Sequence, residues 1–136
     1  MNNTFFDNYK PNNLSDINLN NETIEIINIY LKNNKMLFLI HGPSLSGKTS
    51  LINILLKEYY NSSNHNDNIL YINLLKEQGI NYFRNEIKNF CQIHNSINIK
   101  QKSIIIDDFD SLNELNQKNL INYINKYNNI NFVLSC

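Results

Sequence analysis

The residues from Gly42 to Thr49 have the types and the spacing that a phosphate-binding loop requires. They read Gly-Pro-Ser-Leu-Ser-Gly-Lys-Thr and match the pattern G-x-x-x-x-G-K-[ST] at all of its fixed positions. The two fixed glycines let a backbone loop fold around an anion with its N–H groups pointing inward. Lys48 would then reach the β- and γ-phosphates of a nucleotide, and the Thr49 hydroxyl would ligate Mg²⁺.

An accidental glycine turn is the alternative interpretation of this stretch. Given average glycine usage, such a match arises by chance in about one chain in a few hundred of this size. The flanking residues argue against a chance match, because an apolar run at 36–40 precedes the loop and apolar residues at helical spacing follow it at 51–55. We therefore predict that a nucleotide binds the loop and the residue after it: Gly42, Pro43, Ser44, Leu45, Ser46, Gly47, Lys48, Thr49 and Ser50.

Two adjacent carboxylates, Asp107 and Asp108, follow a run of three isoleucines at 104–106. A buried strand would deliver Asp107 to the sheet edge that carries the loop, where its carboxylate can hold the hydration shell of Mg²⁺. Asp108 could orient or deprotonate an attacking water, although aspartate is shorter than glutamate. A strand that merely runs into an acidic turn is the alternative. With the loop upstream, we interpret Asp107 as a metal residue and Asp108 as the candidate catalytic base.

The elements that must position these groups alternate between helix and strand. We expect an extended arm at 1–19, helices at 22–33, from Lys48 to near Tyr60, from Ile80 to Phe90 and at 112–127, and strands at 36–40, 69–73, 104–106 and 131–134. Asn20 or Asn21 can cap the first helix, and Ile24, Ile27 and Leu31 share one of its faces. Near-continuous apolar strands separated by helices predict a parallel sheet covered on both faces, with the loop at its carboxyl edge.

Length and composition narrow the classes of function. A chain of 136 residues is one domain at most, and its 12 basic and 12 acidic residues give zero net charge, which argues against a free-standing nucleic-acid binder. Cys91 and Cys136 are too few for a metal site or a disulfide framework. The N-terminus lacks the features of a secretory signal and no apolar run reaches membrane-spanning length, so we expect a soluble, intracellular protein.

Five stretches occur in an order that is more specific than any of them alone. They are Tyr9-Lys10-Pro11 with Leu14 to Ile17, the loop itself, Ile69 to Asn73 followed by Gly79-Ile80 and Arg84, Asp107 to Leu112, and Phe132 to Cys136. In this order they resemble the small subunits of replication factor C, the sliding-clamp loaders of the AAA+ ATPase family. The similarity covers nearly the whole chain.

The resemblance implies a fold, cofactors and partners. The fold would be that of a P-loop NTPase, a three-layer α/β/α domain with a parallel sheet, and the cofactors would be ATP and Mg²⁺. Tyr9 and Pro11, in the arm 1–19, would lie near the adenine. The partners would be the other subunits of a hetero-oligomeric ring, a sliding clamp and primer–template DNA. The protein would act in the nucleus or, for a virus, in an infected-cell replication compartment.

The chain also departs from the family pattern. Leu45 and Ser46 replace Gly-Thr, and Asp108 stands where the family has a catalytic glutamate. Ile121 and Asn122 occupy the positions of paired arginines. The sequence given stops at Cys136, so we expect a partial AAA+ domain spanning 1–136 without the last strand, the lid and the collar, either as a fragment or as a degenerate viral-type or split copy. The strand at 36–40 would then form an apolar edge.

Three functions remain open at this point. The first is an ATP-hydrolysing subunit of a clamp loader, in which Arg84 and Lys88, one turn apart on a helix face, contact a DNA phosphate; a solvated helix face is the alternative for that pair. The second is a nucleotide-binding module for assembly that does not hydrolyse ATP. The third is another AAA+ relative, such as an origin-binding or helicase-loading ATPase.

Overall fold

The fold alternates helices and strands, as the hydrophobic periodicity predicts. The structure, a computed structural model, describes residues 10–61, 66–73, 80–93 and 100–136. The elements follow one another as α1 (Asn21–Lys32), β1 (Leu37–Ile40), α2 (Lys48–Tyr60), β2 (Ile69–Asn73), α3 (Ile80–Gln92), β3 (Ser103–Asp107), α4 (Glu114–Lys126) and β4 (Asn131–Ser135). Short 3₁₀ turns occur at Leu14–Asp16, Asn66–Asn68 and Phe109–Ser111.

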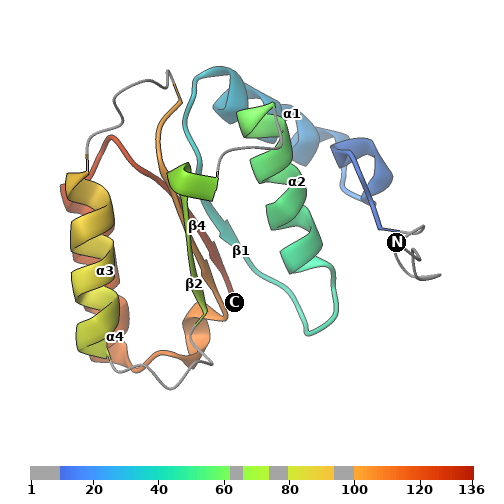
Figure 1. Cartoon of the computed structure of the whole chain (residues 1–136). Coiled ribbons are helices and arrows are strands. Elements are labelled where there is room, and N and C mark those ends of the chain that lie inside the picture. The colour runs from blue at the N-terminus through green and yellow to red at the C-terminus, as the bar shows by residue number, and fades with distance from the viewer. Residues whose placement is uncertain (1–9, 62–65, 74–79, 94–99) are drawn as a thin grey trace, which may run out of the picture.

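The strands form one parallel sheet, in the order β1-β4-β3-β2 across the described residues. The crossover from β1 to β2 runs along the sheet in the direction opposite to those from β2 to β3 and from β3 to β4. Because such crossovers are right-handed, α2 must lie on one face and α3 and α4 on the other. Figure 1 shows this arrangement, with α1 beside α2. The predicted three-layer α/β/α fold is confirmed.

Two apolar layers hold the sheet between the helices. Alternate residues of β3 and β4 point to opposite faces, so Ile105 and Val133 pack in the layer under α1 and α2, whereas Ile104, Ile106 and Phe132 pack under α3 and α4. All five side chains are almost wholly buried. Each contributes about 1.5–3 kcal/mol by leaving water. Burial on both faces explains why these strands read as unbroken apolar runs.

β1 is covered less completely than the central strands. Within the described part of the chain it pairs with β4 alone, in the register Leu37 with Phe132 and Leu39 with Leu134. On the α3 and α4 face, Leu37 and Leu39 are 58% and 63% exposed. Phe38 and Ile40, on the other face, are half-buried in the layer with α2. The expected apolar edge is therefore present along this strand.

The N-terminal region departs from the extended arm that the sequence predicts. Leu14–Asp16 form a 3₁₀ turn, and Leu14 is buried against the layer that contains α2. The Asp16 carboxylate accepts hydrogen bonds from the N–H groups of Asn12 and Asn13 at 2.8 and 3.0 Å. The sequence pattern did not predict this turn, because one buried leucine and one hydrogen-bonding carboxylate produce no hydrophobic periodicity.

The helix boundaries agree with the predictions to within about two residues. Asn20 caps α1, accepting from the Thr23 N–H at 2.8 Å, and Ile27 on the predicted face is buried. The last predicted helix begins later than expected, at Glu114 rather than residue 112. The reason is that Phe109–Ser111 form a 3₁₀ turn and Asn113 then caps α4.

Two expectations from composition can be compared with the structure. Cys91 and Cys136 are both free thiols and both half-buried. Burial raises the pKa of Cys91 to about 11, which makes its thiol unreactive at neutral pH. Among the helices that the structure describes, none has the length and apolar character to cross a lipid bilayer.

Candidate nucleotide-phosphate site

The loop between β1 and α2 needs glycine at Gly47 and packs closely at Gly42. Gly47 has φ +89°, a backbone conformation that residues with a side chain rarely adopt, and α2 begins at the next residue. A Cβ atom on Gly42 would lie 2.9 Å from the Ser46 Oγ. Gly47 is therefore required by its backbone angle, whereas a side chain at Gly42 would need the Ser46 hydroxyl to turn away.

Leu45 takes a conformation better suited to the glycine that the family pattern has at this position. Its φ is +64° and its side chain is fully exposed. A residue with a Cβ pays about 1–2 kcal/mol for this conformation. The turn is closed beside it by a hydrogen bond from the Ser46 N–H to the Pro43 carbonyl at 3.2 Å. The loop keeps its turn at some local backbone strain.

Lys48 places its charge against the loop. Its ammonium donates to the carbonyls of Gly42 at 2.7 Å and of Pro43 at 3.0 Å. Lys48 is also the first residue of α2, a helix of 13 residues whose free N–H groups and partial positive charge face the same space. Ammonium, backbone amides and helix end together make this a candidate anion site.

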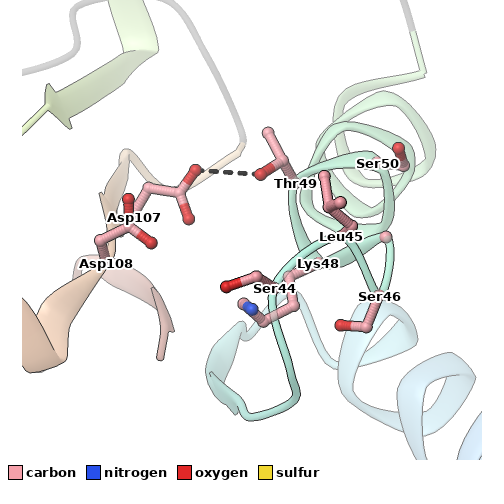
Figure 2. A pocket seen from close by; sticks show the side chains of 9 residues that line it. Ser44, Leu45, Ser46, Lys48, Thr49, Ser50, Asp107 and Asp108 are labelled. Carbon is pink, nitrogen blue, oxygen red and sulfur yellow. Dashed lines mark hydrogen bonds between the residues drawn. The ribbon is translucent and has the colours of Figure 1, made fainter.

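The loop borders a pocket of about 390 Å³ that opens at the carboxyl edge of the sheet. Its walls are Ser44, Leu45, Ser46, Gly47, Lys48, Thr49, Ser50, Asp107 and Asp108. Figure 2 shows the loop on one side and the two aspartates on the other. Every one of these residues was predicted from the sequence. Of the predicted loop residues, Gly42 and Pro43 do not line the pocket, and they contribute by accepting hydrogen bonds from Lys48.

Asp107, at the end of β3, is held by three hydroxyl groups. Thr49 donates to its Oδ2 at 3.1 Å, across the pocket (Figure 2). Tyr71 donates to the same oxygen at 2.9 Å, and Ser135 donates to Oδ1. Burial alone would raise the pKa of Asp107, but these hydrogen bonds, from Ser135, Tyr71 and Thr49 in that order, outweigh it and lower the pKa. The carboxylate is therefore ionised at neutral pH.

The donor set fits Mg²⁺. This ion prefers oxygen ligands, keeps several waters and is commonly bound through one or two carboxylates together with phosphates. Thr49 and Asp107 supply a hydroxyl and a carboxylate oxygen that lie within 3.1 Å of each other. In the described residues no three acidic, histidine or cysteine side chains form a cluster that could hold a metal by themselves. Phosphate and water would have to complete the coordination.

Asp108 lies at the pocket with its side chain exposed. Its φ of +55° turns the chain out of β3, and its N–H donates to the Ser135 Oγ at 3.2 Å. Aspartate tolerates this left-handed conformation better than most residues. The structure thus brings Asp108 to the site, and its role as a catalytic base stays a prediction.

Three further predicted residues, Pro11, Arg84 and Lys88, do not line the pocket, and Tyr9 lies outside the described residues. The arm next to Pro11 contacts the last turns of α2, where Lys57 donates to the Asn12 carbonyl at 3.3 Å. Arg84 and Lys88 lie on α3, which covers the other face of the sheet from α2 (Figure 1). Their proposed contacts with adenine and DNA remain predictions.

Sequence reasoning missed Tyr71 and Ser135. Both reach Asp107 from neighbouring strands, so their role depends on the register of β2 and β4 against β3. Ser135 carried a usable signal, because it is the polar residue that ends an apolar strand at the carboxyl edge. Tyr71 carried none, because a tyrosine within a strand is typical of any sheet.

The chain has the fold of the P-loop NTPase class. Its parallel sheet carries a glycine loop after the first strand and an acid at the end of β3. The AAA domain family matches residues 33–136, and the chain belongs to that family. It is 32% identical to the replication factor C small subunit of Picrophilus torridus over 138 residues, covering 100% of this chain and 43% of the relative.

Two relatives from Saccharomyces cerevisiae are similarly close. Replication factor C subunit 3 is 31% identical over 105 residues, covering 76% of this chain and 31% of the relative. Replication factor C subunit 2 is 32% identical over 115 residues, covering 76% of this chain and 33% of the relative. The chain thus spans less than half the length of these three relatives.

Proposed function

We propose that this chain is the nucleotide-binding part of a subunit of a DNA sliding-clamp loader that acts in DNA replication. The proposal is supported by the AAA domain and by relatives named as replication factor C subunits. The observation that carries it is the contact between Thr49 and Asp107. These side chains lie 58 residues apart in the chain, yet their oxygens are 3.1 Å apart at the mouth of the loop pocket.

The loop residues bind the phosphates of ATP in this proposal. Backbone N–H groups at the start of α2 and the Lys48 ammonium meet the phosphate oxygens, and Lys48 exchanges hydrogen bonds to loop carbonyls for bonds to phosphate. Thr49 and Asp107 would hold Mg²⁺. When bound, Mg²⁺ would supply the positive charge that offsets the negative charge developing on the phosphate oxygens. Asp108 would orient the attacking water.

We further propose that the chain hydrolyses ATP, and we expect this activity only in an assembled complex. A clamp-loader subunit would draw its remaining catalytic groups from the other subunits of the ring. Arg84 is the only arginine of the sequence, and it lies on α3 rather than at the pocket. We propose that an arginine from a neighbouring subunit stabilises the transferred phosphoryl group.

A module that binds ATP but does not hydrolyse it is the second candidate. It is favoured by Asp108, whose carboxylate is shorter than glutamate and whose backbone is already turned by φ +55°. Steady-state phosphate release, measured with and without partner subunits, separates the two. ATP that stays bound without turnover in the complex would support the non-hydrolysing module.

DNA and the sliding clamp are proposed as partners of the assembled complex. Arg84 and Lys88 are proposed to contact a DNA phosphate within the ring. For the chain alone, its zero net charge predicts little DNA affinity, because phosphate contacts supply most of the binding free energy. Tight, sequence-independent binding of DNA by the isolated chain at physiological salt would contradict this assignment.

The experiment that tests the site is ATP binding by the variant Lys48→Ala. Loss of charged hydrogen bonds worth about 3 kcal/mol corresponds to a loss in affinity of about a hundredfold. At an ATP concentration that gives about 90% occupancy of the wild type, we expect the variant to be less than about 10% occupied. Lys118→Ala is the control, because it removes the same charge from the exposed surface of α4, outside the pocket lining. ATP affinity that is unchanged in Lys48→Ala would refute the site.

A further inference from the structure

Tyr71 makes a contact that the proposed function leaves unexplained. It lies in β2, where it pairs with Ile105 of β3, two residues before Asp107. Residues two apart on a strand share a face, so Tyr71 and Asp107 are diagonal neighbours on the α2 side of the sheet. That separation is within reach of a long aromatic side chain. The Tyr71 hydroxyl indeed lies 2.9 Å from the Asp107 Oδ2.

The direction of this hydrogen bond is fixed by chemistry. An ionised carboxylate can only accept, so the phenol must donate. Burial, and then the hydrogen bond to Asp107 and its negative charge, raise the pKa of Tyr71 well above its usual value. The hydroxyl therefore keeps its proton, and remains a donor, at any pH at which the protein works.

Three donors leave the Asp107 carboxylate little freedom to turn. Ser135 holds Oδ1 from β4, while Thr49 and Tyr71 hold Oδ2 from α2 and β2. A carboxylate has about four lone-pair positions, so about one remains free for a further partner. Groups that orient a metal ligand in this way commonly change metal affinity when they are removed.

We propose that Tyr71 is a positioning residue for Mg²⁺, whose hydroxyl fixes the Asp107 carboxylate opposite Thr49. The inference rests on the proposed function, because it concerns the same site. It gives a part in metal binding to β2, which lies at the opposite edge of the described sheet from β1 and its loop. Ser135 holds the other oxygen, and within the described residues Tyr71 is the donor that reaches Oδ2 from β2.

The test measures how ADP binding by the full chain depends on Mg²⁺ for wild type and Tyr71→Phe. We expect the variant to need about tenfold more Mg²⁺ for the half-maximal increase in ADP affinity. ADP affinity in EDTA should not change, because Tyr71 does not line the loop pocket. The substitution keeps the ring of a 42% exposed side chain, so the unfolding temperature should also stay close to that of wild type.

Tyr30→Phe is the matched control. Tyr30 is also 42% exposed, but it lies on α1 with its ring against Phe38. Tyr30→Phe also removes one hydroxyl, and it should change neither the Mg²⁺ requirement nor the ADP affinity in EDTA. An unchanged or lower Mg²⁺ requirement in Tyr71→Phe would overturn the inference, and so would an equal loss of ADP affinity with Mg²⁺ and in EDTA. These results leave the nucleotide site standing, whereas a wild type that binds no ADP would remove both.

Discussion

At the scale of single residues, tyrosine hydroxyls serve both the site and the core. Tyr71 contacts Asp107 at the site. Tyr60, the last residue of α2, is only 5% exposed and lies near the residues that precede β2 and β3. The Tyr60 hydroxyl meets the carbonyls of Asn68 and Gln101 at 3.2 and 2.9 Å and the Ser103 Oγ at 2.8 Å. It donates its single proton to one acceptor at a time and can accept from the Ser103 hydroxyl, so it joins these polar groups in one hydrogen-bond network.

Tyr60→Phe should lower the free energy of unfolding by about 1–3 kcal/mol at neutral pH, because those buried groups lose a partner. Burial raises the pKa of Tyr60 from 10.0 to about 12. The fold therefore favours the neutral phenol, and its contribution is complete below pH 10 and lost as pH rises from 10 to 12. Urea unfolding of both proteins at pH 7 and pH 11 should show the difference shrinking. A difference that stays constant over this range would contradict the prediction.

How far the site could be predicted depends on whether its groups are neighbours in the chain. Lys48 and Thr49 follow from a local pattern, and Asp107 follows because a buried strand must end at the same edge. Tyr71 and Ser135 depend on register between strands, which a single sequence does not determine. A hydroxyl in a strand gives no sign of whether it faces solvent or an acid.

At the scale of elements, capping residues decide where the helices begin. Asn20 and Asn113 each accept a hydrogen bond from the N–H group three residues later, at 2.8 and 3.0 Å. Local chemistry of this kind made the start of α1 predictable. The start of α4 was predicted too early because Leu112 fits the helical spacing, whereas the cap lies one residue beyond it. Three-residue turns such as Phe109–Ser111 give no periodic signal at all.

Asn113→Ala should lower the free energy of unfolding by about 1 kcal/mol, because the Asn116 N–H at the start of α4 loses its side-chain acceptor. Asn125→Ala in the same helix is the control. Its side chain is exposed, and alanine favours helix more than asparagine does. Denaturant unfolding measures both. Equal destabilisation by the two substitutions would show that the cap has no special part in stability.

At the scale of the whole molecule, the sheet has one well-covered centre and one apolar edge. β3 and β4 are buried on both faces, whereas β1 exposes Leu37 and Leu39 over the described structure. Right-handed crossovers determine which face each helix covers, and the strand order β1-β4-β3-β2 fits the class of fold that the glycine-loop motif indicates. The position of β1 at an edge of the sheet was predicted only from the resemblance to the family. The periodicity of four apolar residues does not distinguish an edge strand from a central one.

Leu39→Lys should reduce self-association of the chain, because exposed apolar edge strands pair with one another. Sedimentation velocity over a range of concentrations measures the effect. Since Leu39 is 63% exposed, the free energy of unfolding should change by only about 0.5 kcal/mol. Leu115→Lys, on α4 with 66% exposure, removes a leucine away from the edge and should leave association unchanged. Equal effects of both substitutions would assign self-association to general surface hydrophobicity instead.

The assignment as a whole depends on a nucleotide that binds between the loop and Asp107 with the help of Mg²⁺. Titration calorimetry of the folded chain with ATP, in Mg²⁺ and again in EDTA, measures this binding. We predict saturable binding at one site, with higher affinity when Mg²⁺ is present. A folded chain that takes up no ATP in either condition would contradict the account.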